Sequence, residues 1–125
     1  MTYLLIVAGA AAGAPLRYFL QQRVQDQTSD PFPLGTLVVN ISGCLAIGIL
    51  AALTEQYGFL SREARLILVT GFLGSYTTFS AFGLESYNLA RADDVARLAL
   101  NVGLSCAMGV AAVALGYLLV RAYPG

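Results

Sequence analysis

The sequence has no histidine, lysine or tryptophan, and charged residues make up only 11% of its 125 positions. Without histidine, and with only two cysteines, it offers no ligand set for zinc and no histidine-activated nucleophile, so we expect no enzyme. Because nucleic-acid binding depends on clustered Lys and Arg, a chain with no lysine and zero net charge is not expected to bind nucleic acid. An ordinary soluble domain would carry about 25% charged residues. The chain is instead 58% hydrophobic, which excludes disorder and indicates an integral membrane protein.

Four apolar stretches reach the length of about 20 residues that a membrane-spanning helix needs. Nearly all the charges lie in the short connections between them, which supports an all-α integral membrane protein with four transmembrane helices. Cys44 and Cys106 fall inside spans, where we expect small packing residues; a disulfide within the membrane is the lesser alternative. We expect one domain over residues 1–125, with spans at about 2–22, 34–54, 64–90 and 95–121.

The arginines give almost no signal for orientation. Four spans place both termini on one side of the membrane, and the arginine tally of the two sides is three against three or four. Orientation normally follows an excess of basic residues on the cytoplasmic side. A chain without that excess can insert both ways and form an antiparallel homodimer; the alternative is that another feature fixes its insertion. The arginines are Arg62, Arg65 and Arg121 on the terminal side, and Arg23, Arg91 and Arg97, with Arg17 near the span end, on the other.

Small residues at a spacing of four let helices approach closely. Gly9 and Gly13 form such a pair in the first span, and Gly103, Ala107 and Ala111 form a stripe in the fourth. Each set can serve packing within the chain or a seam between two copies.

The third predicted span contains poor helix formers at its centre, namely Gly71, Gly74, Thr77 and Thr78. They predict a helix that is broken in the middle of the membrane, whereas the alternative is a glycine-rich but continuous helix. Backbone unwound at this depth must be buried or line a cavity, and its free carbonyls typically bind monovalent cations.

Polar and aromatic side chains also fall within the spans. Asn40 lies about two turns into the second span, Phe79 and Phe82 share a face of the third, and Asn101 and Ser105 are four apart on the fourth. Amides, hydroxyls and the positive edges of aromatic rings suit a small anion. The alternatives are interhelical hydrogen bonding for the asparagine and core packing for the rings.

Two charged residues lie within or near the spans. Glu85 is the only acidic residue well inside one, where it can relay protons, be protonated or reach toward the surface. Arg17, near the end of the first span, can make a water-filled mouth electropositive or simply extend to the surface.

Three segments resemble one known family, the Fluc (CrcB) fluoride channels, and the likeness runs nearly end to end. The fourth span matches only loosely. The segments are residues 13–18 (GAPLRY), 35–43 (GTLVVNISG) and 71–82 (GFLGSYTTFSAF).

This resemblance implies a passive channel that exports fluoride across the inner cell membrane. It also implies an antiparallel, dual-topology homodimer in the bilayer, with two pores lined by both subunits and a central structural sodium ion. Asn40 matches the pore asparagine, and Phe79 and Phe82 match phenylalanines whose ring edges face the ion. Gly74 and Thr77 match the positions whose backbone carbonyls, from both chains, bind the sodium.

Further pore positions follow from the same resemblance. Ser80 falls at a polar position near the phenylalanines, and Glu85 matches a glutamate that flanks the pore. Asn101 and Ser105 would lie on a polar track of the fourth helix. Ala81 departs from the family, because many relatives have threonine there, and Asn101 stands where some relatives have tyrosine.

Two other functions are compatible with four small spans. One is a small proton-coupled multidrug-type transporter; that class needs a carboxylate in its first helix, and here only Glu85 could substitute. The other is a non-transporting assembly subunit, in which Asn40 and the phenylalanines would have no special role.

Overall fold

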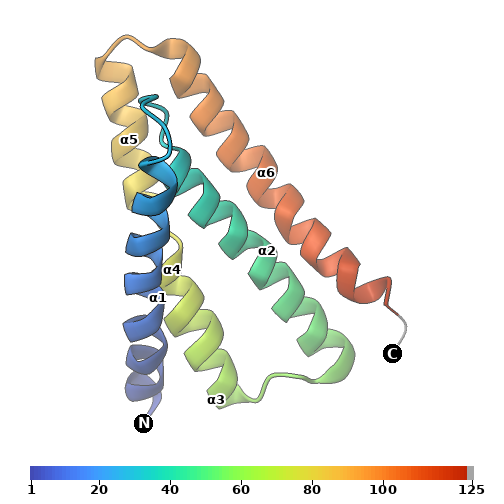
Figure 1. The fold of residues 1–125 in the computed structure, drawn as a ribbon. Helices are drawn as coiled ribbons and strands as arrows, with labels where there is room; N and C mark the ends of the chain where they lie inside the picture. Colours follow the sequence, from blue (N-terminus) through green and yellow to red (C-terminus); the bar gives the residue numbers. More distant parts are fainter. Residues whose placement is uncertain (124–125) are drawn as a thin grey trace.

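The computed structural model describes residues 1–123, whose regular elements are all helices (Figure 1). Four helical stretches are long and apolar enough to cross a membrane, which confirms the predicted all-α, four-span membrane protein. Three of them are continuous: α1 (Thr2–Gln25), α2 (Leu34–Tyr57) and α6 (Val95–Arg121). The helices α1 and α2 each end three residues beyond the predicted limits of 22 and 54.

The third span, Arg62–Arg91, is built from four shorter helices. These are α3 (Arg62–Arg65), the π-helix η1 (Leu66–Leu73), α4 (Gly74–Tyr76) and α5 (Phe79–Arg91). Thr77 (φ −83°, ψ 157°) and Thr78 (φ −146°, ψ 116°) are extended between α4 and α5. The predicted break is therefore present, and the alternative of a continuous third helix is wrong.

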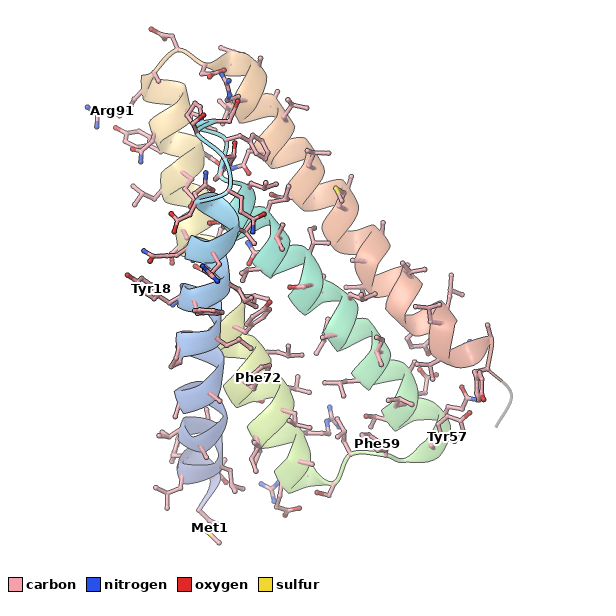
Figure 2. The ribbon with its side chains drawn as sticks, in the orientation of Figure 1. Met1, Tyr18, Tyr57, Phe59, Phe72 and Arg91 are labelled. Atoms are coloured by element: carbon pink, nitrogen blue, oxygen red, sulfur yellow. The ribbon has the colours of Figure 1, made fainter. Side chains whose placement is uncertain are left out.

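The start of α1 and the end of α6 lie at the same end of the bundle, as four spans require (Figure 1). The connection 58–61 lies at that end too, and Tyr57 and Phe59 project there (Figure 2). Both rings are exposed, as is typical of aromatic side chains at a membrane surface. The other two connections, 26–33 and 92–94, lie at the opposite end.

Glycines bring the helices into backbone contact. The most extensive packing is between α2 and α6 and between α1 and η1. A methyl group on Gly9 would overlap the Ile67 carbonyl oxygen, and one on Gly13 would overlap that of Phe72. The Gly9–Gly13 pair therefore serves packing within the chain, against η1.

The small-residue stripe of α6 is not used in this way. A methyl group on Gly103 would meet no atom, and Ala107 and Ala111 are exposed. Both cysteines are free thiols: Cys44 is half-buried, whereas Cys106 is exposed and is not a packing residue within the protomer.

Arg97 ties the first connection to the start of α6. Its guanidinium forms salt bridges with Asp30 at 2.9 Å and with Asp94 at 2.6 Å. Asp94 also accepts a hydrogen bond from the Arg97 backbone amide at 3.1 Å and so caps α6. The hydrogen bond from Arg97, with a second from the Phe32 amide, lowers the pKa of Asp30 to about 2.

We expect Arg97→Gln to raise the pKa of Asp30 from about 2 toward its ordinary value of 3.8. Because the pKa is lowered in the folded protein, the stabilisation from ionised Asp30 is complete above its ordinary pKa and is lost as the pH falls toward 2. The measurement is an NMR titration of aspartate-labelled protein in micelles. Arg91→Gln, which removes a guanidinium that forms no salt bridge with Asp30, is the control and should leave the titration unchanged. An unchanged midpoint in Arg97→Gln would contradict the pairing.

Candidate functional site

The break in the third span is held by Asn40 of α2. The Asn40 side-chain nitrogen donates to the Thr78 carbonyl oxygen at 3.0 Å, and its side-chain oxygen accepts from the Thr78 amide at 2.8 Å. Thr78 is only 8% exposed, so its backbone needs these partners once it leaves the helical pattern. Since a primary amide has two N–H groups, Asn40 keeps one N–H beyond the bond to Thr78.

The residues before Thr78 also rest on α2. The Tyr76 hydroxyl lies 2.8 Å from the Ser42 hydroxyl, and the Thr77 methyl packs so closely on Gly43 that a methyl group there would overlap it. Three successive residues, 76–78, are thus fixed by one short segment of α2. Sequence reasoning missed Ser42 and Tyr76; their places directly beside the Asn40 motif and the break were the available signal.

Gly74 and Thr77 contribute carbonyl groups at the break. In a continuous α-helix the Thr78 amide would donate to the Gly74 carbonyl, but here it donates to Asn40. Gly74 is exposed, and both residues line a surface pocket of about 250 Å³. Neutral carbonyl oxygens freed from a helix are suitable ligands for a monovalent cation.

Phe79 and Phe82 lie on the first turn of α5, directly after the break. Their ring centroids are 5.5 Å apart and their planes are tilted by 43°. Phe82 is half-buried, whereas Phe79 is 83% exposed. The Ser80 hydroxyl, also exposed, lies 3.3 Å from the Thr78 hydroxyl. The structure therefore brings the predicted residues around Asn40 together and leaves one ring uncovered.

A second feature is an open pocket of about 550 Å³ between α1, the first connection, α2 and α5. Arg17 and Glu85, two of the charged residues singled out in the sequence, both line it. Tyr18, at the same pocket, points away from α2 and α6 (Figure 2). The complete lining is Arg17, Tyr18, Gln21, Gln22, Gln25, Asp26, Pro31, Pro33, Thr36, Ala81 and Glu85.

Glu85 is oriented by a hydrogen bond from Thr36 of α2, which is itself held by Gln21 of α1. The Thr36 hydroxyl donates to Glu85 Oε1 at 2.6 Å and accepts from the Gln21 side-chain amide at 2.7 Å. Glu85 Oε2 and Arg17 Nε are buried without a hydrogen-bond partner among the described residues. Two polar atoms of opposite charge type at this pocket thus have hydrogen-bonding capacity that the described protomer does not use. Gln21 could not be predicted as a site residue, because nothing in the sequence around it indicates the contact with Thr36.

The fourth-helix candidates lie elsewhere in the protomer. Asn101 is only 2% exposed, and its amide donates to the Ser86 hydroxyl at 3.0 Å. Its side chain thereby joins α6 to α5. Ser105 is half-buried one turn further along α6. Neither residue lines the pocket that contains Arg17 and Glu85 or the pocket beside the break.

Comparison with known proteins relates this arrangement to one family. Residues 4–117 match the family described as "CrcB-like protein, Camphor Resistance (CrcB)". The chain is 42% identical over 119 residues to "Fluoride-specific ion channel FluC" of Maridesulfovibrio salexigens, covering 95% of this chain and 94% of that protein. It is 43% identical over 121 residues to the protein of the same name from Solibacter usitatus, covering 97% and 99% of the two chains.

A further relative shows similar coverage. "Fluoride-specific ion channel FluC 1" of Methanosarcina acetivorans is 42% identical over 115 residues, which is 92% of this chain and 87% of that protein. The matches span all four helical stretches and the break between α4 and α5. By its sequence over nearly its whole length, the chain belongs to the CrcB-like protein family.

Proposed function

We propose that this multi-pass membrane protein is a fluoride channel that lets fluoride leave the cell passively through the inner membrane. The observation that carries the proposal is the spare N–H of Asn40 at a break in a membrane-spanning helix, where Asn40 bonds Thr78, the residue directly before the exposed Phe79. The relatives named as fluoride-specific ion channels share about 40% of its residues. An ion channel is not an enzyme class, and we assign no catalytic activity.

The site can replace the water of a small anion. Fluoride holds its hydration shell tightly, so a pore must offer several donors at once and yet release the ion. Asn40 offers an N–H, Ser80 a hydroxyl, and Phe79 and Phe82 offer ring edges, which carry the positive part of the ring quadrupole. Arg17 in the open pocket would raise the local concentration of anions.

A second copy of the chain would complete the pore. A four-helix bundle is filled by its own side chains and leaves little room for a channel. Phe79, at 83% exposure, would be covered by a partner. The nearly even arginine count favours an antiparallel, dual-topology homodimer, and its twofold symmetry gives two equivalent pores.

The carbonyl groups of Gly74 and Thr77 would hold a structural sodium ion at the centre of this dimer. They fit because they are neutral oxygen donors next to backbone that has left the helical pattern. The two residues of one protomer supply too few ligands by themselves, so the same pair from the partner would complete the shell. The bound ion would supply a fixed positive charge.

Three further residues belong to the proposed pore. Glu85 and Ser105 remain predicted pore residues, and Asn101 would need its partner subunit, or a rearrangement, to reach an ion because it is 2% exposed. The comparisons do not favour a multidrug-type transporter, and the first helix has no carboxylate, consistent with that result.

Fluoride efflux from liposomes that contain only this protein tests the proposal. We expect fluoride to leave far faster than from empty liposomes of the same lipid, and chloride to be retained. The measurement uses fluoride- and chloride-selective electrodes. A potassium ionophore is added so that potassium can leave with the anion and no opposing membrane potential builds up. Efflux of fluoride no faster than from empty liposomes, in protein shown to be folded, would contradict the function.

A further inference from the structure

The Tyr76 side chain is buried in the core next to the break, and its hydroxyl contacts α2. Tyr76 is 7% exposed and packs with Val39 and Leu73. Its ring is parallel to that of Phe72, with the centroids 5.9 Å apart and the planes within 5°. This packing fixes the ring, so its hydroxyl has little freedom to choose a partner. That partner is the Ser42 hydroxyl, at 2.8 Å.

The direction of this hydrogen bond follows from the number of protons. The Ser42 hydroxyl has a single proton and donates it to the Val39 carbonyl at 3.0 Å. Ser42 must therefore accept from Tyr76. The result is a directed chain from the Tyr76 O–H through the Ser42 hydroxyl to the backbone of α2.

This chain of hydrogen bonds holds the residue before Thr77, whereas Asn40 holds the residue after it. Asn40 fixes Thr78, the residue after Thr77, and Ser42 fixes Tyr76, the residue before it. Between them Thr77 packs on Gly43. With residues 76 and 78 both attached to α2, the peptide groups around Thr77 have little rotational freedom, and the direction of the Thr77 carbonyl is set.

We propose that Tyr76 and Ser42 are positioning residues for the cation site formed by the carbonyls of Gly74 and Thr77. The inference rests on the sodium site of the proposed function and adds the residues that preorganise it. A phenylalanine at position 76 would fill the same space but would leave the segment before the break without its polar attachment. The carbonyls would then spend part of their time turned away from the cation, and affinity for the ion would fall.

Sodium-dependent thermal stabilisation of the purified protein in detergent tests this role, because a ligand of the folded state raises the melting temperature. Sodium chloride is titrated against choline chloride at constant ionic strength. We expect the wild-type melting temperature to rise to a plateau with sodium. In Tyr76→Phe, and separately in Ser42→Ala, the half-saturating sodium concentration should rise about threefold to tenfold, the effect of one lost hydrogen bond.

Two controls make the result specific. Tyr3→Phe removes the hydroxyl of a tyrosine that is 82% exposed, and should keep the wild-type sodium midpoint. The double variant of Tyr76 and Ser42 should shift the midpoint no further than either single change, because both remove one shared bond. If Tyr76→Phe fails to fold, Ser42→Ala carries the test.

The possible failures can be told apart. Variants that melt earlier at every sodium concentration but keep the wild-type midpoint would show a merely structural role and overturn the inference. A wild-type protein whose melting temperature is the same in sodium and in choline would overturn the sodium site itself, and the inference with it.

Discussion

Replacing Asn40 with aspartic acid should slow fluoride efflux from liposomes about tenfold to hundredfold, the effect of one lost hydrogen bond to an ion, while the protein stays folded. The reason lies in the two bonds that Asn40 makes with the Thr78 backbone, at 2.8 and 3.0 Å. A protonated carboxyl can reproduce both, accepting from the amide through one oxygen and donating to the carbonyl through the other. Only the second N–H of the asparagine, the one proposed to face fluoride, has no replacement.

The Asn40→Leu variant measures a different quantity. Leucine has the same number of non-hydrogen side-chain atoms and the same branching but loses both bonds, and it leaves the N–H and C=O of Thr78, which is 8% exposed, without partners. Each buried unsatisfied group costs about 1–3 kcal/mol. The leucine variant therefore combines damage to the break with loss of the anion donor, whereas the aspartic acid variant isolates the donor.

Asn88→Asp is the matched control, since it makes the same chemical change at an exposed position of α5 and should keep wild-type efflux. Efflux is measured with a fluoride electrode, and folding by thermal melting of the same samples. Full efflux in Asn40→Asp, together with loss of efflux in Asn40→Leu, would contradict the prediction. It would show that Asn40 only fixes the backbone at the break and does not donate to fluoride.

The two interpretations of Asn40 from the sequence, interhelical hydrogen bonding and ion binding, are compatible in the structure. The Asn40 side-chain amide has one more N–H group than is needed to pair with the Thr78 backbone. The bond to Thr78 uses one N–H and the carbonyl oxygen, and these contacts hold the side chain in a single orientation. A donor fixed in this way loses little entropy when an ion arrives, which is the advantage of preorganisation.

Features that depend on local composition could be predicted from the sequence. The four spans follow from runs of apolar residues, and the break follows from Gly74, Thr77 and Thr78. Both properties belong to short segments and do not require knowledge of the neighbours. The extent of each span was less accurate, because α1 and α2 continue through polar residues such as Gln25 and Glu55.

Features that depend on which helix faces meet could not be predicted in this way. The π-helix η1 is one example, because its backbone lies directly against Gly9 and Gly13 of α1. Asn101 is another: the sequence places it four residues from Ser105, but only the structure shows that its side chain donates to Ser86 of α5. A spacing of four defines a face of a helix but not the element that the face meets.

The contact between α1 and η1, which depends on which helix faces meet, also gives the largest expected effect on stability. That effect is expected at Gly9. We expect Gly9→Ala to lower the free energy of unfolding by about 1–3 kcal/mol or more, as overpacking does in tight cores. The added methyl group would overlap the Ile67 carbonyl oxygen and come within 2.8 Å of the Phe72 amide nitrogen. Both are backbone atoms, so the clash cannot be relieved by a side-chain rotation, and α1 must move away from η1.

Gly103→Ala is the control because a methyl group there meets nothing within the protomer. Alanine also favours a helix over glycine by about 1 kcal/mol, so this variant should be as stable as the wild type or more stable. Reversible unfolding in mixed detergent micelles measures both variants against the wild type. Wild-type stability of Gly9→Ala would contradict the close contact between α1 and η1. Destabilisation by Gly103→Ala that grows with protein concentration would instead place the stripe of Gly103, Ala107 and Ala111 in the contact between two copies, since only an assembled partner could bring atoms to that open face.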